Sequence, residues 1–289
     1  MNVLTTKYDL PTFGNYASAA VNVVIVVLFL VALWLILDKI TGFDDERELF
    51  VNRNMAYAVL RISLVAGQAI ALLPLVGVDD DERWNVWPLL GWGAAVTVIV
   101  LLLEVGSDRI LRRRGGGNDV AGISMSDSVA RGGFYIATGL IFNAVLSGSA
   151  PSLGQAIAAS IAFAVLGLVA LLVGYAVLGF VGPFRSRRRL GGDDLAASII
   201  SAGVVIGLGF ILRLAIAGDF TGWGHGLLGF AVTFLLGYVL LIVLIFLLDA
   251  VLVRSQNLRQ IVTGNETVAA CVMAAILVAV SLVIGSADV

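Results

Sequence analysis

The hydrophobic residues of this chain form long unbroken runs that are separated by short polar segments. A helix needs about 20 apolar residues to cross a hydrocarbon core roughly 30 Å thick. Eight runs approach or exceed that length, at residues 19–37, 55–78, 86–103, 128–146, 153–181, 195–217, 226–248 and 267–284. A surface helix of a soluble protein would instead repeat its apolar residues every three to four positions. The pattern therefore predicts an all-α, polytopic membrane protein with eight transmembrane helices.

Composition supports this fold class and narrows the possible chemistry. Of the 289 residues, 60% are hydrophobic and 13% are charged, against about 25% charged in soluble domains. Cys271 is the single cysteine and His225 the single histidine. The chain therefore has too few soft ligands for an ordinary zinc, haem or iron–sulfur site. We expect no metal site, no cofactor and no catalytic residues.

The basic residues predict how the spans are oriented, because Lys and Arg are retained on the cytoplasmic side of a membrane. The connections after the first, third, fifth and seventh runs hold Lys39, Arg47, Arg53, Arg109, Arg112, Arg113, Arg114, Arg185, Arg187, Arg188, Arg189, Arg254 and Arg259. The termini and the other connections hold only Lys7 and Arg83. This asymmetry predicts that both termini lie outside and that the basic connections face the cytoplasm.

Short motifs recur in the same order in the two halves of the chain. The pairs are NRNMAYA at 52–58 with GDDLAAS at 192–198, and SDSVA at 126–130 with NETVA at 265–269. Glu104 and Asp249 each stand shortly before an arginine at the inner end of a span. Because each half holds an even number of spans, both halves enter the membrane the same way up. The sequence predicts two parallel four-helix repeats, at residues 1–150 and 151–289.

At these motifs the chain resembles the YjfL-like family of bacterial inner-membrane proteins, which is grouped as domain of unknown function 350. The family pattern matches NMAYA at 54–58, DSVARG at 127–132 and IFNA at 141–144. The second half keeps DLAAS and ETVAA but has VSLVIG, at 280–285, in place of IFNA. The resemblance implies a tandem duplication in the bacterial plasma membrane with a more divergent second half. It supplies no catalytic residues.

Several charged residues fall inside the predicted spans or at their ends. Arg61 lies seven residues past Asn54, which places its backbone roughly 10 Å into the hydrocarbon at about 1.5 Å per residue. A charge near mid-bilayer costs at least about 2.5–3.5 kcal/mol on insertion scales, so it must be paired, solvated or able to reach the headgroups. The candidate buried polar layer near the cytoplasmic side consists of Arg61, Glu104, Asp127, Arg131, Asp249 and Glu266.

Two pairings are expected in the first half. Asp127 and Arg131 are one helical turn apart and can pair on one helix face, which leaves Arg61 and Glu104 as a cross-helix pair. Asp127 and Glu266 also lie at the starts of their spans, where an N-cap role would explain them without any function.

The second half lacks basic residues at the matching depth. Ser201 and Ala270 occupy the positions that match the two buried arginines. Asp249 must therefore pair with a first-half arginine, use Arg254, face water or be protonated. The first and third alternatives both predict a polar layer on the cytoplasmic side of the bundle.

Other polar and small residues within the spans suggest structural roles. Arg213 lies four residues from the outer end of its span and is interpreted as a headgroup anchor. Gln68 and Asn143 are expected to form hydrogen bonds between helices, and Gly203 with Gly207 to form a close packing face.

Three classes of function remain open. The first is a structural or regulatory membrane component whose basic loops, 112–117 and 185–189, bind anionic lipid or a peripheral protein, unless they serve only as topology signals. The second is a proton or small-ion channel or transporter that uses the buried charges. The third, an intramembrane enzyme, is disfavoured because the sequence has no HExxH motif, no GxSxG motif and no second histidine. We favour the first class and expect no nucleic-acid partner.

Overall fold

The computed structural model describes residues 13–41, 45–76, 86–115, 123–179, 194–251 and 258–286. Within these ranges every regular element is a helix. In chain order they are α1 (Phe13–Thr41), the short π-helix η1 (Arg47–Val51), α2 (Met55–Leu72), the short 3-10 helix η2 (Leu73–Val76), α3 (Trp87–Gly115), α4 (Met125–Ser147), α5 (Leu153–Leu178), α6 (Leu195–Ile216), α7 (Trp223–Val251), α8 (Leu258–Thr263) and α9 (Thr267–Gly285). The predicted all-α fold class is confirmed.

Polar side chains fix where four of the long helices begin. Asn54 precedes α2, Ser124 precedes α4, Ser152 precedes α5 and Asp194 precedes α6. In each case the side-chain oxygen accepts a hydrogen bond from the backbone N–H three residues later. Such caps satisfy N–H groups that the helix itself leaves without partners. They explain why Asn54 and Asp194 occupy equivalent places in the two repeated motifs.

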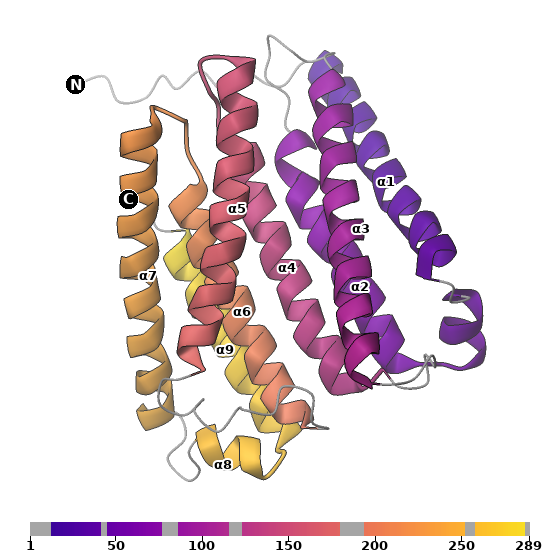
Figure 1. Cartoon of the computed structure of the whole chain (residues 1–289), viewed down its shortest axis with the longest axis vertical. Helices are drawn as coiled ribbons and strands as arrows, with labels where there is room; N and C mark the ends of the chain where they lie inside the picture. The colour runs from indigo at the N-terminus through magenta and orange to yellow at the C-terminus, as the bar shows by residue number, and fades with distance from the viewer. Residues whose placement is uncertain are drawn as a thin grey trace.

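Eight helices in the described residues are long and apolar enough to cross a membrane. Their spans are Ala17–Ile40, Met55–Val76, Trp87–Gly106, Met125–Ser147, Leu153–Leu178, Leu195–Ile216, Trp223–Leu247 and Thr267–Gly285. Each overlaps one of the predicted runs and differs from it by a few residues at the ends. The short helices η1 and α8 were not predicted, and Figure 1 shows both at the lower end of the bundle.

The second, fourth, sixth and eighth spans, α2, α4, α6 and α9, pack side by side in that order. We call these four helices the central row. The other spans pack against it: α1 on α2, α3 on α2 and α4, α5 on α4 and α6, and α7 on α6 and α9. Because every second crossing runs in the same direction, the helices of the central row are parallel, and all four begin at the lower end of the bundle in Figure 1.

Small residues let the helices of the central row approach closely. A Cβ atom added at Gly133 would lie 2.7 Å from the Cα atom of Ala202, and one at Gly203 would lie 2.8 Å from the Cα atom of Ala274. Only glycine fits at these positions without movement of the facing backbone. Gly207 also packs against α9, where an added Cβ atom would lie 2.6 Å from the Ser281 hydroxyl oxygen. The predicted packing face at Gly203 and Gly207 is therefore confirmed.

The two halves pack their row helices in the same register. Three facing pairs in α2 and α4 have counterparts in α6 and α9: Ser63–Gly132 with Gly203–Ala274, Gly67–Gly139 with Gly207–Ser281, and Ile70–Asn143 with Phe210–Gly285. In all three, residue numbers rise by 140 from α2 to α6 and by 142 from α4 to α9. This shared register supports the predicted internal repeat.

The register corrects one equivalence that the motifs predicted. SDSVA and NETVA are spaced by 139 residues in the sequence, whereas the packing relates α4 to α9 by 142. The difference is close to one helical turn. Ser124 and Glu266, which both occupy the N-cap position of their helix, are therefore equivalent. The counterpart of Arg131 is Met273 and not Ala270.

Candidate functional site

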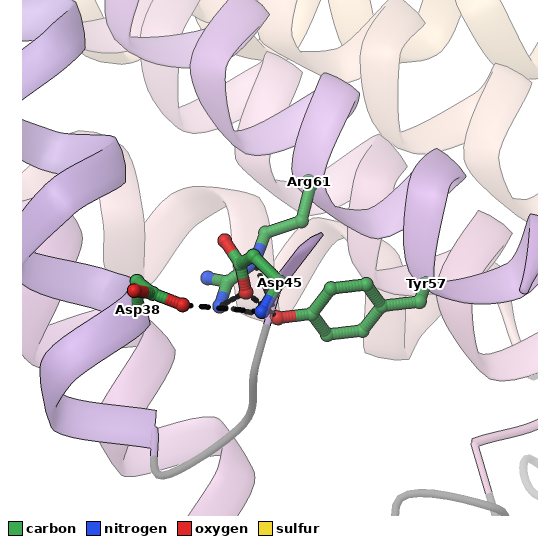
Figure 2. Close-up of polar contacts among 4 residues, drawn as sticks. All are labelled: Asp38, Asp45, Tyr57 and Arg61. Atoms are coloured by element: carbon green, nitrogen blue, oxygen red, sulfur yellow. Dashed lines mark hydrogen bonds and ion pairs between the residues drawn. The ribbon is translucent and has the colours of Figure 1, made fainter. Parts of the chain in front are cut away.

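Arg61, Asp45 and Tyr57 form a buried cluster near the start of α2, which we call the first triad. Arg61 Nη2 donates to Asp45 Oδ1 at 2.9 Å, and the Tyr57 hydroxyl donates to the same oxygen. Arg61 Nε donates to the Tyr57 hydroxyl oxygen at 2.9 Å. The exposed fractions are 2% for Arg61, 4% for Asp45 and 1% for Tyr57. Figure 2 shows the guanidinium and the phenol converging on the carboxylate, so the arginine finds its counter-charge inside the protein.

The connection between α1 and α2 folds back to place Asp45 in this cluster. The Asp45 N–H donates to Asp38 Oδ1 at 3.1 Å, which joins the connection to the end of α1 (Figure 2). Glu48, in η1, accepts hydrogen bonds from the side-chain amides of Asn52 at 2.8 Å and Asn54 at 3.2 Å. These bonds hold η1 against the start of α2. A carboxylate from a connecting segment thereby becomes part of the interior.

Arg131, Glu104 and Tyr135 form a second cluster, which we call the second triad. Glu104 and Tyr135 are buried and Arg131 is partly buried. Arg131 Nη2 donates to Glu104 Oε2 at 2.8 Å, and the Tyr135 hydroxyl donates to the same oxygen. Arg131 Nη2 also donates to the Tyr135 hydroxyl oxygen at 3.2 Å. Glu104 lies about three turns before the end of α3, too far for the helix dipole, which acts within the last turn, to affect it strongly. Arg131 supplies the counter-charge of Glu104 and joins α4 to α3.

The two triads share one chemical arrangement. In each, a single carboxylate oxygen accepts from both an arginine and a tyrosine. The arginine and the tyrosine are four residues apart on one helix, so both project from the same face. Hydrogen bonds between ionised partners are stronger than neutral ones. Each triad is therefore suited to holding two segments of the chain together within the membrane.

The structure brings three of the six predicted layer residues, Arg61, Glu104 and Arg131, into these triads. The predicted pairing within the layer is wrong. Arg61 pairs with Asp45 instead of Glu104, and Glu104 pairs with Arg131, which was expected to pair with Asp127. The reason is that Asp45, placed by its sequence position in a loop, folds inward and supplies the counter-charge for Arg61.

The remaining members of the predicted layer lie apart from the triads or outside the described side chains. Asp127 is in the first turn of α4, and its N–H donates to the Ser124 side chain, so Ser124 and not Asp127 is the N-cap. Glu266 stands at the N-cap position of α9 and is exposed, but its side chain forms no cap hydrogen bond, so the expected capping role is met by its position alone. Asp249 is in α7, but its side chain and the pairing expected for it lie outside the described part of the chain.

Sequence reasoning missed Asp45, Tyr57 and Tyr135. One signal for the tyrosines was available, because each stands one helical turn from a buried arginine. Asp45 carried no such signal, since it lies among other acidic residues of a polar connection.

The second half has neutral or apolar side chains at the equivalent positions. Ser201 is the counterpart of Arg61, and its Oγ accepts a hydrogen bond from the Tyr175 hydroxyl at 3.2 Å. Met273 and Leu277 are the counterparts of Arg131 and Tyr135, and both are buried. The triads are thus a property of the first half among the described residues.

Removing the hydroxyl of Tyr135 tests how strongly the second triad stabilises the fold. We expect Tyr135→Phe to lower the free energy of unfolding by about 1.5–3 kcal/mol, because the buried Glu104 carboxylate loses a donor. Tyr175→Phe is the matched control and should cost about 0.5–1.5 kcal/mol, since its partner Ser201 is neutral. Reversible unfolding in mixed detergent micelles, followed by circular dichroism, measures both. Equal losses in the two variants would contradict the charge-assisted role of Tyr135.

Three further polar contacts lie higher in the bundle. Gln68 Nε2 donates to Thr97 Oγ1 at 2.8 Å, and Asn143 Nδ2 donates to the Ile70 carbonyl at 2.8 Å, so the predicted interhelical bonds of both residues are confirmed. Arg213 Nε donates to Asn143 Oδ1 at 2.9 Å. The interpretation of Arg213 as a headgroup anchor therefore needs correction, because its side chain joins α6 to α4.

A cavity of about 500 Å³ opens at the upper end of the bundle, between α4, α5, α6 and α7. Its lining includes Phe163, Phe230 and the exposed His225. The Ser149 hydroxyl and N–H both donate to Asp219 Oδ1, at 2.7 and 2.9 Å, and these bonds lower the pKa of Asp219 below its usual value of 3.8. They join the α4–α5 and α6–α7 connections above the cavity.

In the described part of the chain, His, Cys, Asp and Glu side chains form no cluster that could hold a metal ion. A family model described as Domain of Unknown Function (DUF350) matches the chain twice, over residues 10–150 and 152–287. No curated protein and no solved structure matches the chain. The two matched segments contain the two sets of helices that pack in the same register.

Proposed function

Since the chain belongs to the DUF350 family over both of its halves, we propose that this multi-pass membrane protein is a non-enzymatic structural or regulatory component of the bacterial plasma membrane. The family description assigns no activity. The proposal therefore rests on what the buried polar groups of the first half can do.

The observation that carries the proposal is that each of the two buried carboxylates has an arginine as its counter-charge within the protein. Both buried carboxylates accept from an arginine and a tyrosine at once. The first triad ties the α1–α2 connection to α2, and the second ties α3 to α4. Removal of one partner from a buried ion pair typically costs about 3–5 kcal/mol. Charges used in this way fix helix positions, which is the task of a structural element.

The proposed orientation places the lower end of the bundle in the cytoplasm. The connections at that end hold most of the lysines and arginines of the chain, and such residues are retained on the cytoplasmic side. The basic segment 112–117, which includes the end of α3, and the basic segment 185–189 would then meet anionic lipid headgroups or a peripheral protein. Their side chains lie outside the described residues, so this partner is proposed from the sequence.

The alternative, a route for protons or small ions, is favoured by one observation. Polar contacts occur at three heights along α2 and α4: the triads, then Gln68 with Thr97, then Asn143 with Arg213. Gln68 lies two helical turns above Arg61, roughly 10 Å at about 1.5 Å per residue. A chain of polar groups across a bilayer is typical of ion and proton pathways.

Flux measurements separate the two functions. The purified protein is reconstituted in liposomes containing a pH-sensitive dye, and a potassium diffusion potential supplies the driving force. We expect proton flux equal to that of protein-free liposomes for both the wild type and Glu104→Gln. A wild-type flux that Glu104→Gln abolishes, while the variant still elutes as a folded protein in detergent, would overturn the structural proposal. The same assay with potassium and sodium gradients covers small cations.

A further inference from the structure

The contact between the two halves is itself a packing of central-row helices. α4, the last span of the first half, packs on α6 in the second half. Gly133 faces Ala202, and Gly209 faces Ala137, where an added Cβ would lie 2.8 Å from the Cα atom of Ala137. The helices are parallel, so one half meets the next through different surfaces: the α4 face of one and the α6 face of the other. Such a head-to-tail contact can be repeated.

The equivalent face of α9 is left open. The shift of 142 residues equates Gly133, Ala137, Leu140 and Ile141 with Ala275, Ala279, Leu282 and Val283. The four α4 residues are buried, whereas all four α9 residues are exposed. Leu282 is 47% exposed and Val283 is 68% exposed, against 5% for Leu140 and 0% for Ile141. The last span therefore has an uncovered apolar face at the place where α4 joins the two halves, with Ala275 in place of Gly133.

The equivalent face of α2 is less covered than that of α6 as well. The shift of 140 residues equates Ala202 and Gly209 of α6 with Ile62 and Ala69 of α2. Ala202 is 9% exposed, whereas Ile62 is 66% exposed. Gly209 is buried, whereas Ala69 is partly exposed. The two ends of the central row thus carry the two complementary halves of the internal contact.

The shapes of these two faces also fit each other. Ala275 and Ala69 take the places of Gly133 and Gly209, where an added Cβ atom would lie 2.7 and 2.8 Å from the facing Cα atoms, so α9 and α2 must lie farther apart than α4 and α6 do. At this wider separation the small side chains of Ala275 and Ala279 leave a groove on α9 that the larger side chain of Ile62 can enter.

We propose that a second copy of this chain packs on the row, with its α2 against the α9 of the first copy. The central row then continues from one molecule into the next, with all helices parallel and at the same depth in the membrane. Ala275 of one chain lies near Ile62 of the next, and Ala279 lies near Ala69, in the register of the contact between α4 and α6 but at a larger distance between the two helices. The contact is heterologous, so it produces either a closed ring or an extended row. The proposal does not depend on what the triads do.

Disulfide cross-linking tests this contact. In a Cys271→Ser background, one tagged chain carries Ala275→Cys and a differently tagged chain carries Ile62→Cys, and the two are co-expressed. Oxidation of isolated membranes with copper phenanthroline is expected to link the two tags. A chain that carries both substitutions should form a ladder of linked species. The control replaces Ala275→Cys by Val243→Cys, at a site that is 56% exposed on α7, and the linked fraction should be severalfold lower.

Each other outcome overturns the proposal. A link between the two tags no stronger than that of the Val243→Cys control means that α9 and α2 face lipid. Cross-linking of Ala275→Cys chains with one another, without the Ile62→Cys partner, means that the copies meet in a symmetric dimer through α9. All substituted positions are exposed on the outside of the bundle, so the variants should fold, and elution of each variant in detergent checks this.

Discussion

Replacing Arg61 by methionine is expected to lower the free energy of unfolding by about 3–5 kcal/mol, because Asp45 then remains charged and buried without its partner. Arg61→Met keeps most of the volume of the side chain, so the loss in the free energy of unfolding measures the effect of removing the charge. Unfolding in mixed detergent micelles measures it. Arg213→Met is the control: Arg213 is only partly buried, and we expect a loss of about 1 kcal/mol there from its single hydrogen bond to Asn143.

A double-mutant cycle identifies the partner of Arg61. Combining Arg61→Met with Asp45→Asn should cost clearly less than the sum of the two single substitutions, because either one already breaks the first triad. Combining Arg61→Met with Glu104→Gln should be closer to additive, since Glu104 belongs to the second triad. The reverse result would restore the pairing of Arg61 with Glu104 that the sequence predicts and would contradict the structure.

The second large effect is expected at Gly139, where α2 and α4 approach most closely. A Cβ atom at this position would meet the carbonyl oxygen of Gly67 and would lie 2.9 Å from its Cα atom. Gly139→Leu must therefore push two backbones apart, and we expect a loss of at least about 3 kcal/mol, at the upper end of overpacking effects. Detergent stability and the yield of folded protein measure this loss.

Gly229 supplies the matched control, because it also lies in a transmembrane helix, α7, and a Cβ added there would meet nothing within 4 Å. Gly229→Leu should be neutral or slightly stabilising, since glycine is about 1 kcal/mol less favourable than alanine in a helix. If both substitutions reduced stability equally, the loss would come from the added leucine in lipid and not from the close packing of α2 on α4.

The spans were predictable because hydrocarbon selects long apolar runs whatever the tertiary arrangement. Gln68 and Asn143 were predictable for a similar reason, since a lone amide in lipid must bond to a neighbouring helix. The partner of Arg61 was not predictable. The pairing of Arg61 with Asp45 requires the α1–α2 connection to fold back over α2. That conformation depends on hydrogen bonds of Glu48 and Asp38, which no local sequence pattern reveals.

The equivalence between α4 and α9, the last spans of the two halves, shows a second limit of prediction from the sequence. SDSVA and NETVA look alike, yet helix packing aligns Ser124 with Glu266. The two motifs resemble each other because both contain polar and small residues, which suit the start of any helix. The true equivalence is set by which residues face α2 or α6, and this requires the three-dimensional contacts at Gly132 and Ala274.

All members of each triad come from two consecutive spans or from the segment that connects them. The first triad takes Asp45 from the α1–α2 connection and its other two members from α2, and the second joins α3 to α4. During synthesis, each of these helical hairpins can therefore leave the translocon with its arginine already neutralised. Neither arginine is then left in lipid without a counter-charge until a later span is inserted. A substitution that breaks a triad should then reduce membrane insertion of that hairpin as well as the stability of the finished protein.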